Sequence, residues 1–336
     1  MSSHHSHTKT LISRRGLLTA AAGTAAAAAL SPALVTPASA KAPMLGAARP
    51  SHYRFRLGAF EVTTLYDGAL AIPKVHPIFG KNQKIEDVQA YLAANHLPVD
   101  KMAISFTPVI VNTGDAVVMF DSGYGEERRG KGAGRMRAAL AMAGFSPEQI
   151  DIVVLTHLHP DHVSGLREGD ETTFPNARYV TGDIEYDFWS KKELLESSNK
   201  AMARRAKAVH DNVVPLAEKI SFIGPGKDVV SGITAIEAYG HTPGHMIYNI
   251  ESAGKRLVLF ADTTNHYAAS LAKPDWHCVF DMDAEKAVAT RKRVLDMIAA
   301  DKVAATGYHM PFPAVGYVEK EGSGYRWIPA SYQLDL

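Results

Sequence analysis

The residues with the clearest chemical potential are three histidines and one aspartate within six consecutive positions. They lie in residues 156–162 (THLHPDH), directly after the apolar run 151–155. Neutral imidazole nitrogen and carboxylate oxygen suit zinc and similar divalent ions, whereas calcium sites are built almost entirely from oxygen. The segment therefore predicts a metal site at the end of a buried strand.

The spacing indicates how these side chains would be shared between ions. A strand sends alternate side chains to the same side, so His157 and His159 can reach one ion together. Asp161 and His162 follow the turn that Pro160 favours, and they can hold a second ion. The alternative is a polar surface loop, but four ligands beside a strand favour the metal site.

Three later positions share this placement at or just beyond the end of an apolar strand. His245 ends a GHTPGH segment, Asp262 follows the run LVLFA, and His309 follows the run VAATG. Each alone has an ordinary explanation, because an aspartate after a strand is usually a turn residue and a single histidine is usually structural. Together with residues 156–162 they form a set of seven candidate ligands.

This ordered set resembles the metallo-β-lactamase superfamily over nearly all of residues 53–330. The resemblance rests on the His-x-His-x-Asp-His segment, the Gly-His-Thr-Pro-Gly-His segment, the pair Ala261-Asp262 and the final His309. It implies two divalent metal ions per chain, with zinc as the expected metal, and an α+β fold. The expected architecture is a four-layer αββα sandwich of two stacked mixed sheets with helices outside.

The resemblance also implies which residues hold which ion. For the first ion they are His157, His159 and His245. For the second ion they are Asp161, His162 and His309. Asp262 is expected to bridge the ions, and Asp121, which matches an early Asp-x-Gly element, to support the ligands. His241 is expected to lie in the turn or to support a ligand in the same way.

Finer features resemble the methyl parathion hydrolase branch, which overlaps with exported lactonases of similar build. They are the segments 174–177 (FPNA), 187–189 (DFW), 309–313 (HMPFP) and 322–326 (GSGYR). Residues 263–281 depart from that branch, and because they follow the bridging aspartate we expect them to line the pocket. The candidate pocket walls are aromatic, with ordinary core packing as the alternative: Trp189, Tyr267, Trp276 and Phe312.

The implied chemistry is hydrolysis assisted by two neighbouring cations. Such a pair acidifies a bridging water to supply hydroxide and polarises the substrate's carbonyl or phosphoryl oxygen. Asp161 and Asp262 are the candidates to accept or shuttle the proton. The expected substrates are small lactones, aryl esters or organophosphate triesters, and one alternative is an exported quorum-quenching lactonase for acyl-homoserine lactones. A non-catalytic metal-binding protein and a redox protein with iron are further alternatives, although mixed His and Asp ligands favour an open catalytic site.

The ligands need strands and helices to position them, and the sequence predicts both. Apolar runs predict a bent strand pair at 53–65 and a strand at 104–112, and Asp67-Gly68 predicts a hairpin turn. Residues 74–84 lack periodicity and predict a long loop beside the site. Apolar residues at helical spacing predict helices, the clearest of them at 85–95, 183–189 and 284–300. Because ligands come from both halves, we expect one hydrolase domain over residues 53–336.

The N-terminal residues have a different character. Residues 1–40 resemble a twin-arginine export signal, with Arg14 and Arg15 before an alanine-rich apolar run and Ala38-Ser39-Ala40 as a cleavage site. An uncleaved membrane anchor is the alternative, which Pro32 and the many weakly apolar alanines disfavour. Residues 41–52 are then a linker. The predicted location is periplasmic or extracellular, without stable membrane association after processing.

Charge and cysteine content narrow the possible partners. The chain has 36 Lys and Arg against 35 Asp and Glu, so nothing favours nucleic-acid binding, and the expected partner is a small-molecule substrate. Cys278 is the single cysteine, which excludes an intramolecular disulfide. A homodimer is compatible with these features.

Overall fold

The computed structural model describes residues 42–330, 332 and 334–336. The predicted export signal lies outside these residues and stays a prediction. Residues 42–48 are exposed and have no regular secondary structure, whereas residues 49–336 form one compact unit. In the described part of the chain, no helix has both the length and the apolar character needed to cross a membrane.

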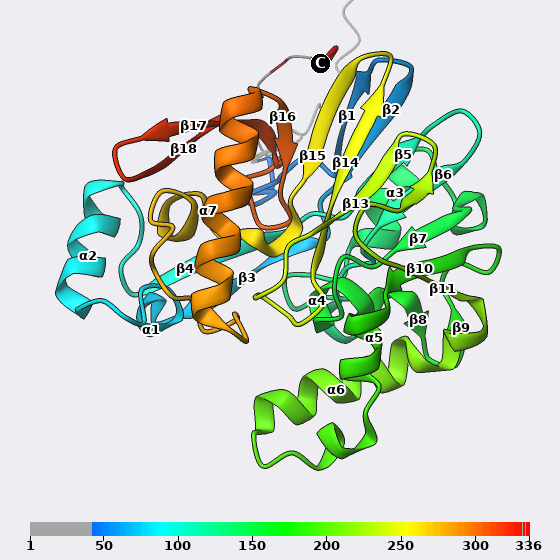
Figure 1. Cartoon of the computed structure of the whole chain (residues 1–336), viewed down its shortest axis with the longest axis horizontal. Coiled ribbons are helices and arrows are strands. Elements are labelled where there is room, and N and C mark those ends of the chain that lie inside the picture. Colours follow the sequence, from blue (N-terminus) through cyan, green and yellow to red (C-terminus); the bar gives the residue numbers. More distant parts are fainter. Residues whose placement is uncertain (1–41, 331, 333) are drawn as a thin grey trace, which may run out of the picture. The chain divides into compact units, whose positions relative to one another are not determined.

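The first of two large sheets has seven strands in the order β1-β2-β5-β6-β7-β10-β11 (Figure 1). Its strands are β1 (His52–Leu57), β2 (Phe60–Leu65), β5 (Val109–Asn112), β6 (Val117–Phe120), β7 (Ile152–Val154), β10 (Arg178–Gly182) and β11 (Ile220–Ile223). The last four in this order are parallel. Their carboxyl ends therefore meet at one edge of the sheet.

The second sheet also has seven strands, in sequence order from β12 to β18. They are β12 (Asp228–Val230), β13 (Ile233–Glu237), β14 (Met246–Ser252), β15 (Lys255–Leu259), β16 (Ala304–Thr306), β17 (Val315–Glu321) and β18 (Gly324–Pro329). Only β15 and β16 are parallel, and the other pairs are antiparallel. The β17–β18 hairpin was not expected from the sequence.

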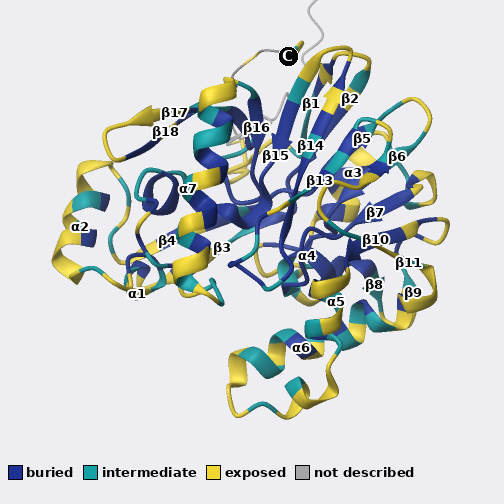
Figure 2. Cartoon of the chain, in the orientation of Figure 1, coloured by how far each residue is buried: buried dark blue, intermediate teal, exposed yellow. Residues whose placement is uncertain are grey.

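The two sheets pack face to face, and helices cover their outer faces. Alternate side chains of a strand go to opposite faces, so Ile152 and Val154 of β7 join the core between the sheets while Val153 packs under the outer layer. Helix α3 (Met136–Met142) contributes to that outer layer, and α7 (Ala284–Asp301) covers the second sheet. Figure 2 shows both sheets largely buried. The predicted four-layer sandwich is confirmed.

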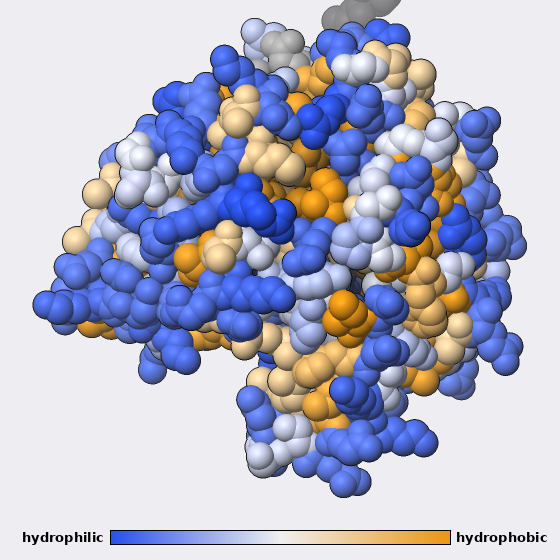
Figure 3. All heavy atoms as spheres, in the orientation of Figure 1, coloured by the Kyte–Doolittle hydropathy of each residue, from blue (hydrophilic) through white to orange (hydrophobic). Residues whose placement is uncertain are grey.

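The remaining helices surround one end of the sandwich. They are α1 (Val75–Ile78), α2 (Ile85–Ala94), α4 (Pro160–Val163), α5 (Asp183–Trp189) and α6 (Lys200–Asn212). The helices predicted at 85–95, 183–189 and 284–300 are confirmed. The loop predicted at 74–84 contains the short α1. Figure 3 shows hydrophilic residues over most of the face in view, with hydrophobic residues in separate groups.

The predicted hairpin at Asp67-Gly68 is wrong. β3 (Gly68–Pro73) pairs with β4 (Lys101–Phe106) in a separate two-stranded sheet, and not with β2. The buried Asp67 carboxylate instead accepts backbone hydrogen bonds from Gly134 and Met136. A Cβ on Gly68 would lie 2.2 Å from the carbonyl oxygen of Gly132, so the glycine serves this close approach and not a tight turn.

The predicted strand at 104–112 is two strands. β4 ends at Phe106 and β5 begins at Val109, because Pro108 between them has no N–H to donate to a neighbouring strand. Its carbonyl oxygen accepts a hydrogen bond from Leu65 N at 2.8 Å. The break lets β4 leave the large sheet. A further short hairpin pairs β8 (Arg167–Glu168) with β9 (Glu171–Thr172).

Candidate metal centre

The first sheet delivers side chains from two adjacent parallel strands. Asp121 directly follows β6, and the segment that carries His157 and His159 follows β7. Pro160 is the first residue of α4, where its fixed φ suits the start of a helix. His162 lies inside α4 and is fully buried. The turn of α4 thus brings the side chain of His162 back toward that of Asp121.

The second sheet contributes from its only parallel pair. Asp262 follows β15 and His309 follows β16, so both lie at the same edge of that sheet. Gly307 is required just before His309, because a Cβ there would lie 2.1 Å from the ring of Phe260. The two sheet edges together surround a single buried group of side chains.

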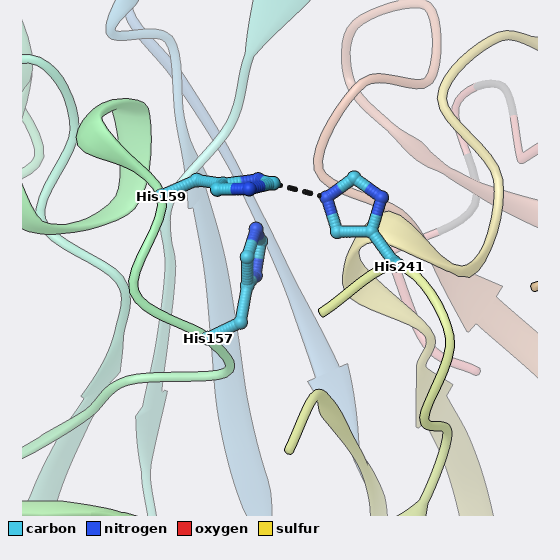
Figure 4. A group of neighbouring side chains, drawn as sticks. All are labelled: His157, His159 and His241. Atoms are coloured by element: carbon cyan, nitrogen blue, oxygen red, sulfur yellow. Dashed lines mark hydrogen bonds between the residues drawn. The ribbon is translucent and has the colours of Figure 1, made fainter. Parts of the chain in front are cut away.

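One part of this group consists of His157, His159 and His241, whose ring nitrogens lie within 4.8 Å of one another. Figure 4 shows the rings of His159 and His241 pointing toward each other, with the ring of His157 turned toward the space between them. His159 Nδ1 and His241 Nε2 lie 3.0 Å apart. All three side chains are buried.

The other part consists of Asp161, His162, Asp262 and His309, whose nearest nitrogen and oxygen atoms also lie within 4.8 Å. His162 Nε2 is 3.4 Å from Asp161 Oδ2 and 3.3 Å from Asp262 Oδ1. His309 Nε2 is 3.5 Å from Asp161 Oδ2. These four side chains come from α4 and from the two strand ends of the second sheet.

Asp262 lies between the two parts. Its Oδ2 atom is 3.3 Å from His241 Nε2 and 3.0 Å from His309 Nε2. Its Oδ1 atom faces His162 Nε2. A single carboxylate therefore contacts imidazoles of both parts, which is the position that a bridging ligand requires.

The two histidines of the GHTPGH segment have different contacts, and the assignment of His245 as a ligand stays a prediction. His241, and not His245, lies with His157 and His159. His245 Nδ1 donates to the carbonyl oxygen of Ala238 at 2.9 Å, and its Nε2 accepts from the backbone N–H of Asp262 at 3.2 Å. Both ring nitrogens of His241 are also engaged, by Asp281 and by His159, and the ring of His245 lies 5.1 Å from that of His157 between centroids.

Three of the other histidines have one ring nitrogen held and the other one directed into the site. His162 Nδ1 donates to Asp121 Oδ2 at 2.8 Å, and His309 Nδ1 donates to the carbonyl oxygen of Ser105 at 2.9 Å. His241 Nδ1 donates to Asp281 Oδ1 at 2.9 Å. A hydrogen bond at one nitrogen fixes the tautomer, so the opposite nitrogen presents its lone pair.

The buried polar atoms also fit a metal. Buried nitrogen and oxygen atoms almost always have a hydrogen-bond partner. Among the described residues, four candidate ligand atoms have none: Nε2 of His157, His159 and His162, and Oδ1 of Asp262. Positively charged ions would complete these contacts, and the mixture of imidazole and carboxylate suits zinc. The two parts together fit a binuclear metal site.

Burial and neighbouring charges shift the pKa values in this group. Burial lowers the pKa of His157 well below its ordinary value, so its imidazole is neutral, as a metal ligand must be. For His162, burial alone would lower the pKa, but three neighbouring carboxylates raise it well above the ordinary value. For Asp262, burial alone would raise the pKa, but His309 and His162 hold this pKa well below its ordinary value.

Asp121 forms hydrogen bonds to the ligand segment, and its supporting role stays a prediction. Its backbone has a φ of 59°, in the left-handed region. Its carboxylate accepts hydrogen bonds from the backbone and hydroxyl of Thr156, in addition to the bond from His162. Asp121 therefore connects the end of β6 to the start of the ligand segment.

Several supporting residues were missed by the sequence analysis. Asp281 holds His241 and also pairs with Arg291 at 2.9 Å, with both of these side chains fully buried. Glu185 of α5 accepts backbone hydrogen bonds from Leu158 and Gly244, and so joins the two histidine segments. Isolated charged residues carry no sequence signal for such pairings, because their partners are distant in the chain.

The four predicted pocket walls separate into two kinds. Trp189 is fully buried and donates its Nε1 hydrogen to Glu185 Oε1 at 2.9 Å. The structure thus places Trp189 in the core behind His159, and not on a pocket wall. Trp276 is also buried, with its ring against Tyr91. The other two are partly exposed: Tyr267, stacked on His266, and Phe312, edge-on to Tyr66.

A cavity of about 340 Å³ lies beside this centre. All of its lining residues except Ala284 lie in the segments 74–84 and 263–281 that the sequence placed near the site: Lys81, Asn82, His277, Cys278, Val279, Asp281 and Ala284. Asp281 connects the cavity to the metal centre through its hydrogen bond to His241. The volume is in the range of small-molecule sites.

The fold and the site define the class of protein. A model of the metallo-beta-lactamase superfamily matches residues 107–302. The chain belongs to this superfamily, and its two His and Asp groups are those of a metal-dependent hydrolase. The narrower resemblance to methyl parathion hydrolase stays a prediction.

Particular relatives include lactonases. The chain is 26% identical to the solved structure of AidC, a dizinc quorum-quenching lactonase, covering 84% of this chain and 98% of that one with a TM-score of 0.75. The hydrolase AbOPH of the beta lactamase superfamily is also 26% identical, with 85% and 100% covered and a TM-score of 0.79. An N-acyl homoserine lactonase of Bacillus cereus is 25% identical over 169 residues, which are 50% of this chain and 59% of that protein.

Proposed function

We propose that this protein is a dizinc lactonase that opens the ring of N-acyl homoserine lactones. The observation that carries the proposal is the position of Asp262 between the two ligand groups, in a chain whose relatives include a dizinc lactonase. His157 and His159 would hold one ion together with a histidine of the GHTPGH segment. Asp161, His162 and His309 would hold the other, with Asp262 shared.

Each residue has a role that follows from its contacts. Two bound cations would supply Lewis acidity and lower the pKa of a water to near neutrality. Asp121, Asp281 and the carbonyl of Ser105 hold the histidines in the tautomers that binding needs. No serine or cysteine nucleophile is required.

Asp161 is the better placed of the two candidate proton carriers. Its side chain is 15% exposed, whereas that of Asp262 is 3% exposed. A carboxylate that reaches solvent can pass a proton to the leaving oxygen and exchange it with water. Asp161 Oδ2 would move this proton, while Asp262 would remain a ligand throughout.

The test is kinetic and is made on protein whose metal content has been measured. We expect about two zinc ions per chain and a much higher kcat/KM for an N-acyl homoserine lactone than for an aryl ester or a dialkyl aryl phosphate. The variant His157→Ala should lose metal and activity together. The proposal fails if the protein holds well under one metal per chain and His157→Ala leaves its activity unchanged. Preference for the phosphate triester would favour the organophosphate alternative.

We also propose that the enzyme acts outside the cytoplasm. Arg14 and Arg15 before the apolar run, with Ala38-Ser39-Ala40 after it, support a twin-arginine route. Cell fractionation with N-terminal sequencing tests this proposal, with the double variant Arg14→Lys and Arg15→Lys as the control. Export of the variant at the wild-type level would contradict it.

A further inference from the structure

Arg205 lies on α6 at the edge of the metal centre. Helix α6 packs against α4, which carries Asp161 and His162 (Figure 1). On the same helix Ala206 is fully buried, whereas Arg204 is exposed. Arg205 is partly buried, and so is intermediate in exposure between Ala206 and Arg204.

The guanidinium of Arg205 has no partner in the described part of the chain. It donates no hydrogen bond and forms no ion pair there, and none of its nitrogens is sealed from solvent. Arg291 shows the usual arrangement, because its buried guanidinium donates to the carbonyl oxygens of Thr263 and Pro274 and to Asp281. A partly buried guanidinium has up to five N–H groups to satisfy, so Arg205 is a ready donor for a ligand.

The charged and polar neighbours of Arg205 locate its head group. The pKa of His159 is lowered first by burial and next by the positive charge of Arg205. Burial lowers the pKa of Arg205 itself, while Asp161 and Cys278 raise it. These neighbours come from the ligand segment and from the lining of the cavity. These electrostatic interactions agree with the packing of α6 on α4, which places Arg205 beside the ligand segment.

We propose that Arg205 is a substrate-binding residue that donates hydrogen bonds to an oxygen outside the bond being broken. In an N-acyl homoserine lactone this acceptor is the carbonyl oxygen of the side-chain amide. The inference rests on the proposed lactonase function. The ions would take the ring carbonyl, and the guanidinium would recognise the second carbonyl with donors in a planar fork. Arg205 thus selects lactones that carry an acyl amide over simple lactones.

The experiment compares two lactones that differ in this amide. One is N-decanoyl homoserine lactone, and the other is a γ-alkyl butyrolactone of similar chain length without an amide. We expect Arg205→Gln to lower kcat/KM for the first by roughly tenfold to a hundredfold, the worth of a hydrogen bond from a charged donor. For the second lactone, kcat/KM should be unchanged. Arg205→Lys should lose less, because it keeps the charge and N–H donors but lacks the planar fork.

Arg204→Gln is the matched control, because it removes the same charge from the next position of α6. It should leave kcat/KM for both lactones unchanged. Calorimetric binding of the ring-opened N-decanoyl-L-homoserine gives a readout without turnover, and Arg205→Gln should weaken it by a similar factor. Zinc content and melting temperature should match those of the wild type.

The outcomes separate the two proposals. Suppose that the wild type cleaves both lactones. If Arg205→Gln then lowers kcat/KM equally for both lactones, or for neither of them, the role of Arg205 is overturned while the lactonase function stands. Unaltered binding of the ring-opened product to Arg205→Gln would also overturn that role. If the wild type cleaves neither lactone, the lactonase function fails, and the inference fails with it.

Discussion

The Nε2 atom of His245 accepts a hydrogen bond from the backbone N–H of Asp262 at 3.2 Å. This bond joins His245 to the backbone of the residue that carries the shared carboxylate. His241, four residues earlier, has the opposite arrangement, because its Nε2 atom faces His159 and Asp262. The two histidines of one short segment thus have different contacts.

The variants His241→Ala and His245→Ala should differ in metal content. His241→Ala removes a ring nitrogen from the first group, so we expect about one zinc per chain and loss of most activity. His245→Ala keeps His157, His159 and His241 in place, and should retain more zinc. It should lower the free energy of unfolding by about 1–3 kcal/mol, because two buried hydrogen bonds are lost. Elemental analysis and denaturant unfolding measure both effects.

The reverse pattern would contradict this assignment. If His245→Ala loses one zinc while His241→Ala retains two, the ligand predicted from the sequence is the correct one. Activity should be compared at saturating zinc, so that a weakened site is distinguished from an absent one.

Asp121→Asn should weaken metal binding without removing a ligand. Asparagine has nearly the same size and tolerates the left-handed backbone at this position. It lacks the charge that holds His162 Nδ1–H, so we expect zinc affinity to fall by about tenfold to a hundredfold. Competition with a chromogenic chelator measures the affinity. Asp115→Asn, an exposed residue of the same type, should bind zinc as the wild type does.

Zinc binding should stabilise the protein more as pH rises. In the metal-free protein the raised pKa of His162 gives stability that is complete below about pH 6.5 and is lost as pH rises through the folded-state pKa. The lowered pKa of Asp262 gives stability that is present above about pH 4 and is lost on further acidification. Zinc must displace the proton of His162, so its affinity increases with pH.

Melting temperatures of zinc-loaded and chelator-treated protein test this between pH 6 and pH 9. The difference between the two should widen toward high pH. A constant or narrowing difference would show that no proton leaves the site when zinc binds.

Glu185→Gln should destabilise the fold. Glu185 Oε1 accepts from Leu158 N and from the indole of Trp189, and Oε2 accepts from Gly244 N. An amide NH₂ group would face at least one of these donors, so we expect a loss of about 1–3 kcal/mol in the free energy of unfolding. Urea unfolding measures the loss. Glu193→Gln, at an exposed position, should change stability by less than about 0.5 kcal/mol.

The sequence by itself determined the ligand types, the strand ends that carry them and the fold class. Buried strands produce continuous apolar runs, and ligands must follow such runs to reach a common edge, so His157, Asp262 and His309 could be placed in advance. The helices over 85–95 and 284–300 were likewise predicted from the helical spacing of their apolar residues.

Only the tertiary structure showed the contacts of His241 and His245, and only it placed Trp189 in the core. Both results depend on which groups meet across the two sheets: Ala238 and the backbone of Asp262 contact the nitrogens of His245, and Glu185 receives the indole of Trp189. Local spacing cannot report such contacts, because the partners are brought together by packing. The unpartnered guanidinium of Arg205 is likewise visible only in the tertiary structure, because the presence or absence of a partner depends on how the chain folds.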